Sequence, residues 1–283
     1  MKTDAESLLK KAVKISSLPT VFNQINEAIE DPECSFLEIA RLIGGDAVLS
    51  ARLLRLANSS FFGFPSPIET ITHAITVIGM APLRDLVLAT TVICQFRGMP
   101  QNGIDMNAFW RHSIACGLGA RIIATYCHEP NVERYYVLGM VHDLGRLIFF
   151  MNLPDQVSRA LEHCQARGEL LYRMEGAAIG CGHAETGALL LRKWRLPERM
   201  QEAVCHHHHP SGARHYQLET SILHVADVIA HALKLGSSGD LLVPELDLKA
   251  WKRIGLPEGL LSSIINQMDH QFPDAIQMFL KEG

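Results

Sequence analysis

The sequence predicts an all-α fold, and three observations lead to this prediction. Apolar residues recur at helical spacing along most of the 283 residues. No run alternates apolar and polar residues at a period of two, as a half-buried strand would. No glycine-rich phosphate loop follows a strand-like segment, since "GLGARI" at Gly117 is too short for one and lies within a helical pattern.

A series of short helices is expected over residues 6–95. The segment 35–60 begins with Ser35 and carries Glu38 three residues later, which is the capping-box signature of a helix start. The turn-rich stretch "FFGFPSP" breaks the pattern, and a helical pattern resumes over 68–96. This part of the chain is therefore expected to be helical throughout, with one exposed turn.

Three polar residues interrupt the apolar runs of this region, namely Asp46, Asn58 and Ser59. Side chains of these types hydrogen-bond to nearby backbone groups and suit helix ends and turns. We therefore expect them to cap helices or to form turns rather than to carry chemistry.

The best linker candidate is "RGMPQNGID", residues 97–105, which holds a proline, two glycines and an asparagine. Helical patterns then occupy residues 107–126, 133–151, 155–167, 177–194, 197–207 and 218–235. The tail from about Gly236 predicts a loop followed by short packing helices. The chain is thus expected to hold two domains, an N-terminal helical part over 1–100 and a second helical domain over 105–283.

Composition narrows the classes of function. The formal net charge is −4 and no long run of Lys and Arg is present, so the sequence does not predict the basic surface that binds nucleic acid. The longest apolar stretch, residues 75–96, is interrupted by Arg84 and Asp85, so no membrane span is expected. Seven cysteines lie singly without a CxxC pair, and the N-terminus carries acids unlike a signal peptide. Reduced thiols and a cytoplasmic location are the expectation.

Histidines and aspartates lie on the expected inward faces of several separate helical segments. His142 and Asp143 are adjacent, His112 and His183 have small apolar neighbours one turn away, and Asp227 lies among leucine and alanine. Each alone is better explained as a core residue with a hydrogen-bonding partner, such as Asp227 with His224 or His231, one turn away on either side. Together they indicate a shared cation, because unpaired buried carboxylates are costly.

A further motif is the run of four histidines, His206–His209, well inside the chain. An expression tag would normally lie at a terminus. A solvated helix end is the simplest alternative to a site.

The order His112, His142-Asp143, Asp227 resembles the H…HD…D signature of the HD phosphohydrolase superfamily. More closely, residues 15–235 resemble HDOD-domain proteins, a bacterial, signalling-associated branch of that superfamily. The resemblance is carried by "LPTVFNQINEAI" and "LEIARLIGGDAVLSARLLRLANSSFFG" in the first half. In the second half it is carried by "GMVHDLGRLIF", "HAETGALLLRKWRLPERMQEAVCHHHHP" and "HVADVIAHA". It implies that the domain over 105–283 is an HD-type helical bundle.

The resemblance also implies a ligand set, by analogy with the related HD-GYP phosphodiesterases. Its members are His112, His142, Asp143, His183, His207, His208 and Asp227. One metal would take His112, His142, Asp143 and Asp227, and a second would take His183, His207 and His208, with Asp143 bridging. The family pattern A-I-x-x-H-H-x-P, aligned on Ala203 and Pro210, selects His207 and His208; a register using His206 and His207 stays open. Such ligands suit two ions of Fe, Mn, Zn, Co or Ni.

Three departures from the HD-GYP enzymes bear on function. Residue 108 is Ala where those enzymes can carry a Glu ligand, Arg146 replaces the Lys that meets the substrate phosphate, and the GYP stretch is absent. Because HDOD proteins are generally regarded as non-catalytic regulators, the first hypothesis is a cytosolic regulatory protein with a retained metal site. Its partner would be a signalling protein or a small phosphorylated ligand.

Two alternatives remain beside the regulatory hypothesis. An active metal-dependent phosphohydrolase on a nucleotide or cyclic dinucleotide would use Asp143 and Arg146 as catalytic residues. A sensor in which an iron pair binds a small molecule or O₂ is the third possibility.

Overall fold

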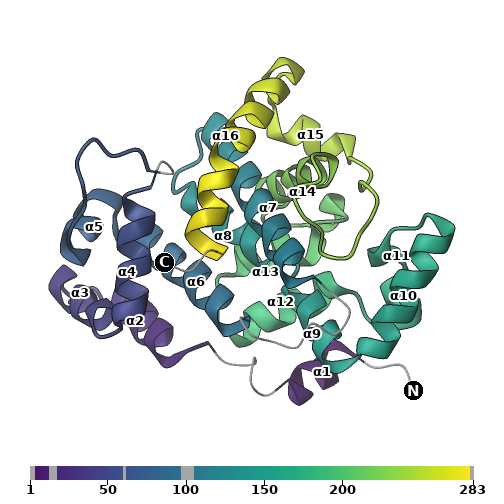
Figure 1. Cartoon of the computed structure of the whole chain (residues 1–283), viewed down its shortest axis with the longest axis horizontal. Coiled ribbons are helices and arrows are strands. Elements are labelled where there is room, and N and C mark those ends of the chain that lie inside the picture. Colours follow the sequence, from purple (N-terminus) through teal and green to yellow (C-terminus); the bar gives the residue numbers. More distant parts are fainter. Residues whose placement is uncertain (1–3, 13–17, 60–61, 97–104, 281–283) are drawn as a thin grey trace.

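The computed structural model describes residues 4–12, 18–59, 62–96 and 105–280, and within these ranges every regular element is helical (Figure 1). This confirms the all-α prediction. The first half of the chain holds α1 (Ala5–Lys11), α2 (Thr20–Glu30), α3 (Phe36–Gly44), α4 (Ala47–Ala57), α5 (Ile71–Ile78) and α6 (Met80–Phe96).

The second half holds ten helices among the described residues. They are α7 (Met106–Tyr126), α8 (Glu133–Val141), α9 (Leu144–Asn152), α10 (Pro154–Arg167), α11 (Leu171–Ala178), α12 (His183–Lys193), α13 (Glu198–His206), α14 (Gln217–Ala232), α15 (Leu248–Ile254) and α16 (Leu261–Leu280). Two short 3₁₀ turns lie at Pro210–Gly212 and Glu258–Leu260. The helices α7, α8 and α14 pack against one another at the centre of this half.

The polar residues that interrupt the N-terminal helices cap them, as predicted. Ser35 and Glu38 form the reciprocal capping box of α3. Asp46 accepts a hydrogen bond from the Leu49 N–H at the start of α4. The Asn58 amide donates to the Leu54 carbonyl oxygen of α4 and exchanges two hydrogen bonds with the Ile68 backbone across the following turn. The Ser59 hydroxyl donates to the Leu56 carbonyl oxygen in the last turn of α4. These residues act locally.

The two halves share one apolar core. Helix α6 packs on α8, α16 contacts both α7 and α4, and α1 lies against α9 and α12 (Figure 1). The predicted linker and the boundary near residue 100 fall mostly at 97–104, outside the described residues, so the division into domains at that point stays a prediction. In the described ranges no single helix is long and apolar enough to cross a membrane. Helices α5 and α6 meet that test only together, and they are bent by 119°.

The helical pattern over 133–151 proves to be two helices. Helix α8 ends at Val141 and α9 begins at Leu144, so His142 and Asp143 form a corner between them. Neighbouring side chains on one continuous helix point about 100° apart, at 3.6 residues per turn. The corner instead lets both side chains face the same interior space. Apolar periodicity on both sides of it concealed the break in the sequence.

Gly145 allows the first turn of α9 to meet the first turn of α12. A Cβ atom at residue 145 would lie 2.0 Å from the His183 carbonyl oxygen and 2.8 Å from the Gly187 nitrogen. Both obstacles are backbone, which cannot move aside as a flexible side chain would. This approach brings Asp143 and His183 together.

We therefore expect Gly145→Ala to lower the free energy of unfolding by about 1–3 kcal/mol, because overpacking against backbone forces the helices apart. Urea unfolding followed by circular dichroism measures this loss. The matched control is Gly176→Ala in α11, where an added Cβ meets no atom within 4 Å. It should be neutral or slightly stabilising, since Ala favours helix over Gly. Equal stability of the two variants would refute the packing role of Gly145.

Candidate metal centre

The residues expected to form a site come together from five parts of the second half. His112 lies on α7, His142 and Asp143 at the corner before α9, and His183 at the start of α12. The pair His207-His208 follows the end of α13, and Asp227 lies on α14. All seven belong to His/Asp groups whose donor atoms lie within 4.8 Å of one another.

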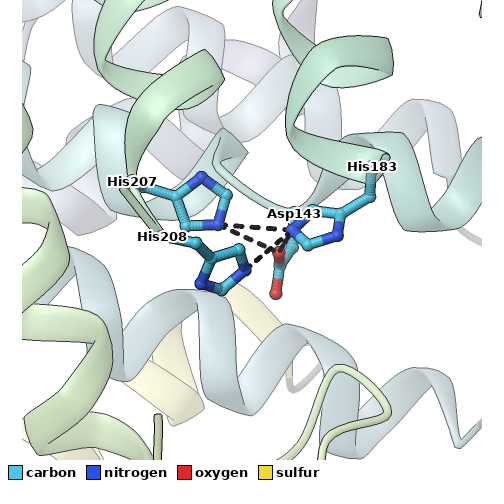
Figure 2. A group of neighbouring side chains, drawn as sticks. All are labelled: Asp143, His183, His207 and His208. Atoms are coloured by element: carbon cyan, nitrogen blue, oxygen red, sulfur yellow. Dashed lines mark hydrogen bonds and ion pairs between the residues drawn. The ribbon is translucent and has the colours of Figure 1, made fainter. Parts of the chain in front are cut away.

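The first group surrounds one oxygen of Asp143. Figure 2 shows the rings of His183, His207 and His208 turned toward one another beside this carboxylate. His183 Nε2 is 3.1 Å from Asp143 Oδ1, and His207 Nε2 is 3.8 Å from the same oxygen. His208 Nε2 lies 3.1 Å from His183 Nε2. Three imidazoles and one carboxylate oxygen thus converge.

The second group surrounds the other oxygen of Asp143. His142 Nε2 is 3.1 Å and His112 Nε2 is 3.7 Å from Asp143 Oδ2. Asp227 Oδ1 is 3.1 Å from His112 Nε2 and 3.7 Å from His142 Nε2. The two oxygens of Asp143 therefore face two different groups of ligand-type atoms.

The Nδ1 atoms of three histidine rings lie within hydrogen-bonding distance of other groups of the protein. Nδ1 of His142 lies 2.7 Å from the Gly139 carbonyl oxygen, and Nδ1 of His207 lies 2.7 Å from the Val204 carbonyl oxygen. Nδ1 of His183 lies 2.6 Å from Glu175 Oε2. A ring that donates from Nδ1 presents a lone pair at Nε2, so these contacts orient three Nε2 atoms for a metal.

The protonation states of the histidines and of Asp143 bear on whether the cluster can bind a cation. Burial lowers the pKa of His112 to about 4 and also lowers the pKa of His207 and of His208, which keeps these rings neutral. Burial opposes ionisation of Asp143, but the charges of His142 and Arg146 outweigh it and hold its pKa well below its usual range. Metal ligands must be ionised carboxylates and unprotonated imidazoles. Burial opposes protonation of His142 and His183, but the neighbouring carboxylates raise the pKa of both rings, so a bound metal would take the place of these protons.

Several buried atoms of the cluster make no hydrogen bond. They are His112 Nε2, His142 Nε2, Asp143 Oδ1, Asp227 Oδ1 and Asp227 Oδ2. Buried polar atoms in folded proteins normally have a partner, and leaving them without one costs free energy. His112 Nε2 and His142 Nε2 lie 3.1–3.7 Å from carboxylate oxygens of Asp143 and Asp227, whereas Asp143 Oδ1 faces the His183 group. Cations held in the two groups would satisfy these atoms. The residues present therefore fit a metal centre of nitrogen and oxygen ligands. The nearby Cys116 belongs to another such group, with His142 and Asp227, but burial raises the pKa of its thiol, which disfavours a thiolate ligand.

The histidine run is divided between the cluster and the surface. His207 and His208 belong to the first group, whereas His206 is half-buried near Gly212 and His209 is exposed. The geometry thus favours the register His207 and His208 over His206 and His207. Tyr172 stacks on the His208 ring with centroids 4.0 Å apart.

Arg146 lies beside the cluster and is only 1% exposed. Its guanidinium pairs with Asp240, donates to the Ser238 hydroxyl at 2.8 Å, and lies 3.4 Å from Glu175 Oε1. These contacts raise the pKa of Arg146 despite its burial, with Asp240 the largest favourable influence. The side chain is therefore bound on several sides by the protein itself.

Sequence reasoning missed two members of this environment. Glu175 accepts from the His183 backbone N–H as well as contacting its ring, and Asp240 pairs with Arg146 while accepting from the Leu171 N–H. Neither Glu175 nor Asp240 is close in sequence to another candidate ligand, because their contacts join segments that are far apart in the chain. Glu175 lies on α11, a helix between the expected segments 155–167 and 177–194, and Asp240 lies in a loop, so the sequence offered no signal for either.

An all-α bundle that gathers a histidine, a His-Asp corner and a later aspartate is the class of fold and site that the resemblance to the HD phosphohydrolase superfamily implies. The HDOD domain profile matches residues 15–210. The chain therefore belongs to the HDOD family.

Known proteins support this fold. An HDOD domain protein of unknown function from Geobacter sulfurreducens is 22% identical, with a TM-score of 0.77 over 98% of this chain and 100% of that chain. A Shewanella amazonensis protein, provisionally named a phosphohydrolase, is 23% identical, with a TM-score of 0.73 over 96% of each chain. An uncharacterized Treponema pallidum protein is 26% identical over 205 residues, which cover 72% of this chain and 39% of that protein.

Proposed function

We propose that this chain is a bacterial regulatory protein whose second half is organised around a buried two-metal centre. The ligands would be His112, His142, Asp143, His183, His207, His208 and Asp227. The convergence of two ligand groups on the two oxygens of Asp143 supports two ions. Imidazole and carboxylate ligands suit Fe, Mn, Zn, Co or Ni. When bound, such ions supply positive charge and Lewis acidity.

The observation that carries the regulatory role is the closure of the centre. The ligand side chains are at most 2% exposed, apart from His208, which is half-buried. The half-buried His208 ring is covered on one face by Tyr172 of α11, with ring centroids 4.0 Å apart. Arg146, the residue expected to meet a substrate phosphate, is occupied by Asp240 and Ser238 of the 236–240 loop. A centre closed in this way stabilises a fold rather than turning over a substrate.

A second candidate function is a metal-dependent phosphohydrolase. It is favoured by the complete ligand set, and by the Shewanella amazonensis relatives provisionally named phosphohydrolase and metal-dependent phosphohydrolase. In that case Asp143 and Arg146 would be the catalytic residues. For the regulatory role, we propose that the partner is a signalling protein or a small phosphorylated ligand. We propose no nucleic-acid or membrane partner, and a cytoplasmic location.

Hydrolysis of bis(p-nitrophenyl) phosphate and of cyclic dinucleotides separates the two functions. The protein loaded with Mn²⁺, Fe²⁺ or Co²⁺ is expected to show no rate above that of its Asp143→Ala variant, because the centre is closed to substrates. A rate that disappears in Asp143→Ala would contradict the regulatory role and establish the phosphohydrolase.

A further inference from the structure

A third imidazole lies at the His112 end of the cluster, on His231. This residue follows Asp227 by one turn of α14 and is 8% exposed. Its Nδ1 is 3.0 Å from Asp227 Oδ1, and its ring centroid is 4.3 Å from that of His112. His112, Asp227 and His231 together form a group whose donor atoms lie within 4.8 Å of one another.

Hydrogen bonds alone do not account for this arrangement. Ring nitrogens of His112, His142 and His231 lie 3.0–3.7 Å from the single oxygen Asp227 Oδ1, yet neither carboxylate oxygen of Asp227 makes a hydrogen bond. His231 Nδ1 lies 3.0 Å from the Asp227 carbonyl oxygen, but its buried Nε2 has no partner. With His231 Nδ1 bonded to that carbonyl oxygen, the Nε2 atoms of His112, His142 and His231 are left without partners around a carboxylate that also has none. A cation bound among these atoms would satisfy them.

The loop after α14 holds His231 in this place. Gly236, at φ +129°, lies directly on the α7 backbone, where a Cβ atom would be 2.4 Å from the His112 nitrogen. The Ser237 N–H donates to the Ala108 carbonyl oxygen at 3.0 Å. The end of α14 is thereby fixed beside the turn of α7 that carries His112, and residue 108 on that turn has no ligand-type side chain of its own.

We propose that His231 is a direct ligand at the His112–Asp227 end of the centre. This inference rests on the proposed function, since it requires that a metal occupy the centre. Each end would then hold three imidazoles, His112, His142 and His231 at one and His183, His207 and His208 at the other, with Asp143 between them. Three neutral nitrogen ligands at each end favour Co²⁺, Ni²⁺, Zn²⁺ or Fe²⁺ over Mg²⁺ and Ca²⁺.

Co²⁺ titration of the metal-free protein, followed by its visible absorption bands, tests the assignment. His231→Asn keeps a side-chain N–H that can donate to Asp227 but removes the imidazole. We expect one of the two Co²⁺ ions to bind more than about 100-fold more weakly, which exceeds the loss usual for outer-sphere partners. The bands of that ion should also change. His206→Ala, a half-buried histidine outside the cluster, should leave affinity and bands unchanged.

Unchanged bands in fully loaded His231→Asn would overturn the assignment, whatever its affinity, because a residue that only orients Asp227 does not alter the ligand set. His231→Ala, checked for folding by circular dichroism, should behave as the Asn variant does; rescue by Asn alone would show an orienting role and also overturn the assignment. Failure of the wild-type protein to bind Co²⁺ would instead overturn the proposed function. The two failures are thus distinguishable.

Discussion

Asp143→Ala is expected to bind neither metal ion, with an affinity loss beyond detection in titrations at micromolar protein. Each oxygen of this carboxylate faces a different ligand group, with His183 Nε2 3.1 Å from Oδ1 and His142 Nε2 3.1 Å from Oδ2. Its removal therefore takes an anionic ligand from both ends at once, which no other residue of the cluster does. Elemental mass spectrometry of the purified variant measures the loss.

The matched control is Asp155→Ala, an exposed acid at the start of α10. It should keep the wild-type metal content, because its carboxylate takes no part in the cluster. If Asp143→Ala kept the wild-type metal content as well, the ligand assignment would be wrong.

Arg146→Met is expected to be the most destabilising substitution near the centre, at about 3–5 kcal/mol of unfolding free energy. Methionine fills much of the volume but leaves the buried carboxylates of Asp240 and Glu175 without their cation. Ion pairs of this kind are costly to break from one side, since the remaining charge stays buried. Urea unfolding at neutral pH measures the effect.

An exposed arginine provides the comparison. Arg173 pairs with Glu245 at 3.1 Å, but the two side chains are 51% and 83% exposed. Arg173→Met should cost about 0–1 kcal/mol, as is usual for surface pairs. Similar losses at residues 146 and 173 would show that Arg146 does not hold the 236–240 loop to the bundle.

Helical periodicity was sufficient to predict most of the fold, because apolar spacing and caps such as Ser35 act within a few residues. It failed at the corner of His142 and Asp143, where apolar residues continue in phase on both sides of a break that only the approach of α12 to Gly145 explains. The contact between α12 and Gly145 joins segments that are far apart in the chain, so it cannot be predicted from the residues around the corner.

The proposed ligands of the candidate site were predictable from the sequence, but the residues around them were not. The seven proposed ligands could be chosen because the family resemblance places them in order, and the structure brings them together. Glu175, Asp240 and His231 could not be chosen on the same grounds. Their roles depend on loops and helix ends that meet in space, such as Gly236 against α7.

Metal content of the untagged protein tests the central claim most directly. Elemental mass spectrometry should find two equivalents of Fe, Mn, Zn, Co or Ni per chain, since two ligand groups share Asp143. One equivalent would contradict the two-metal centre. No metal, even after incubation with each ion, would mean that the buried histidines and aspartates only pack together, and the proposed centre would have to be abandoned.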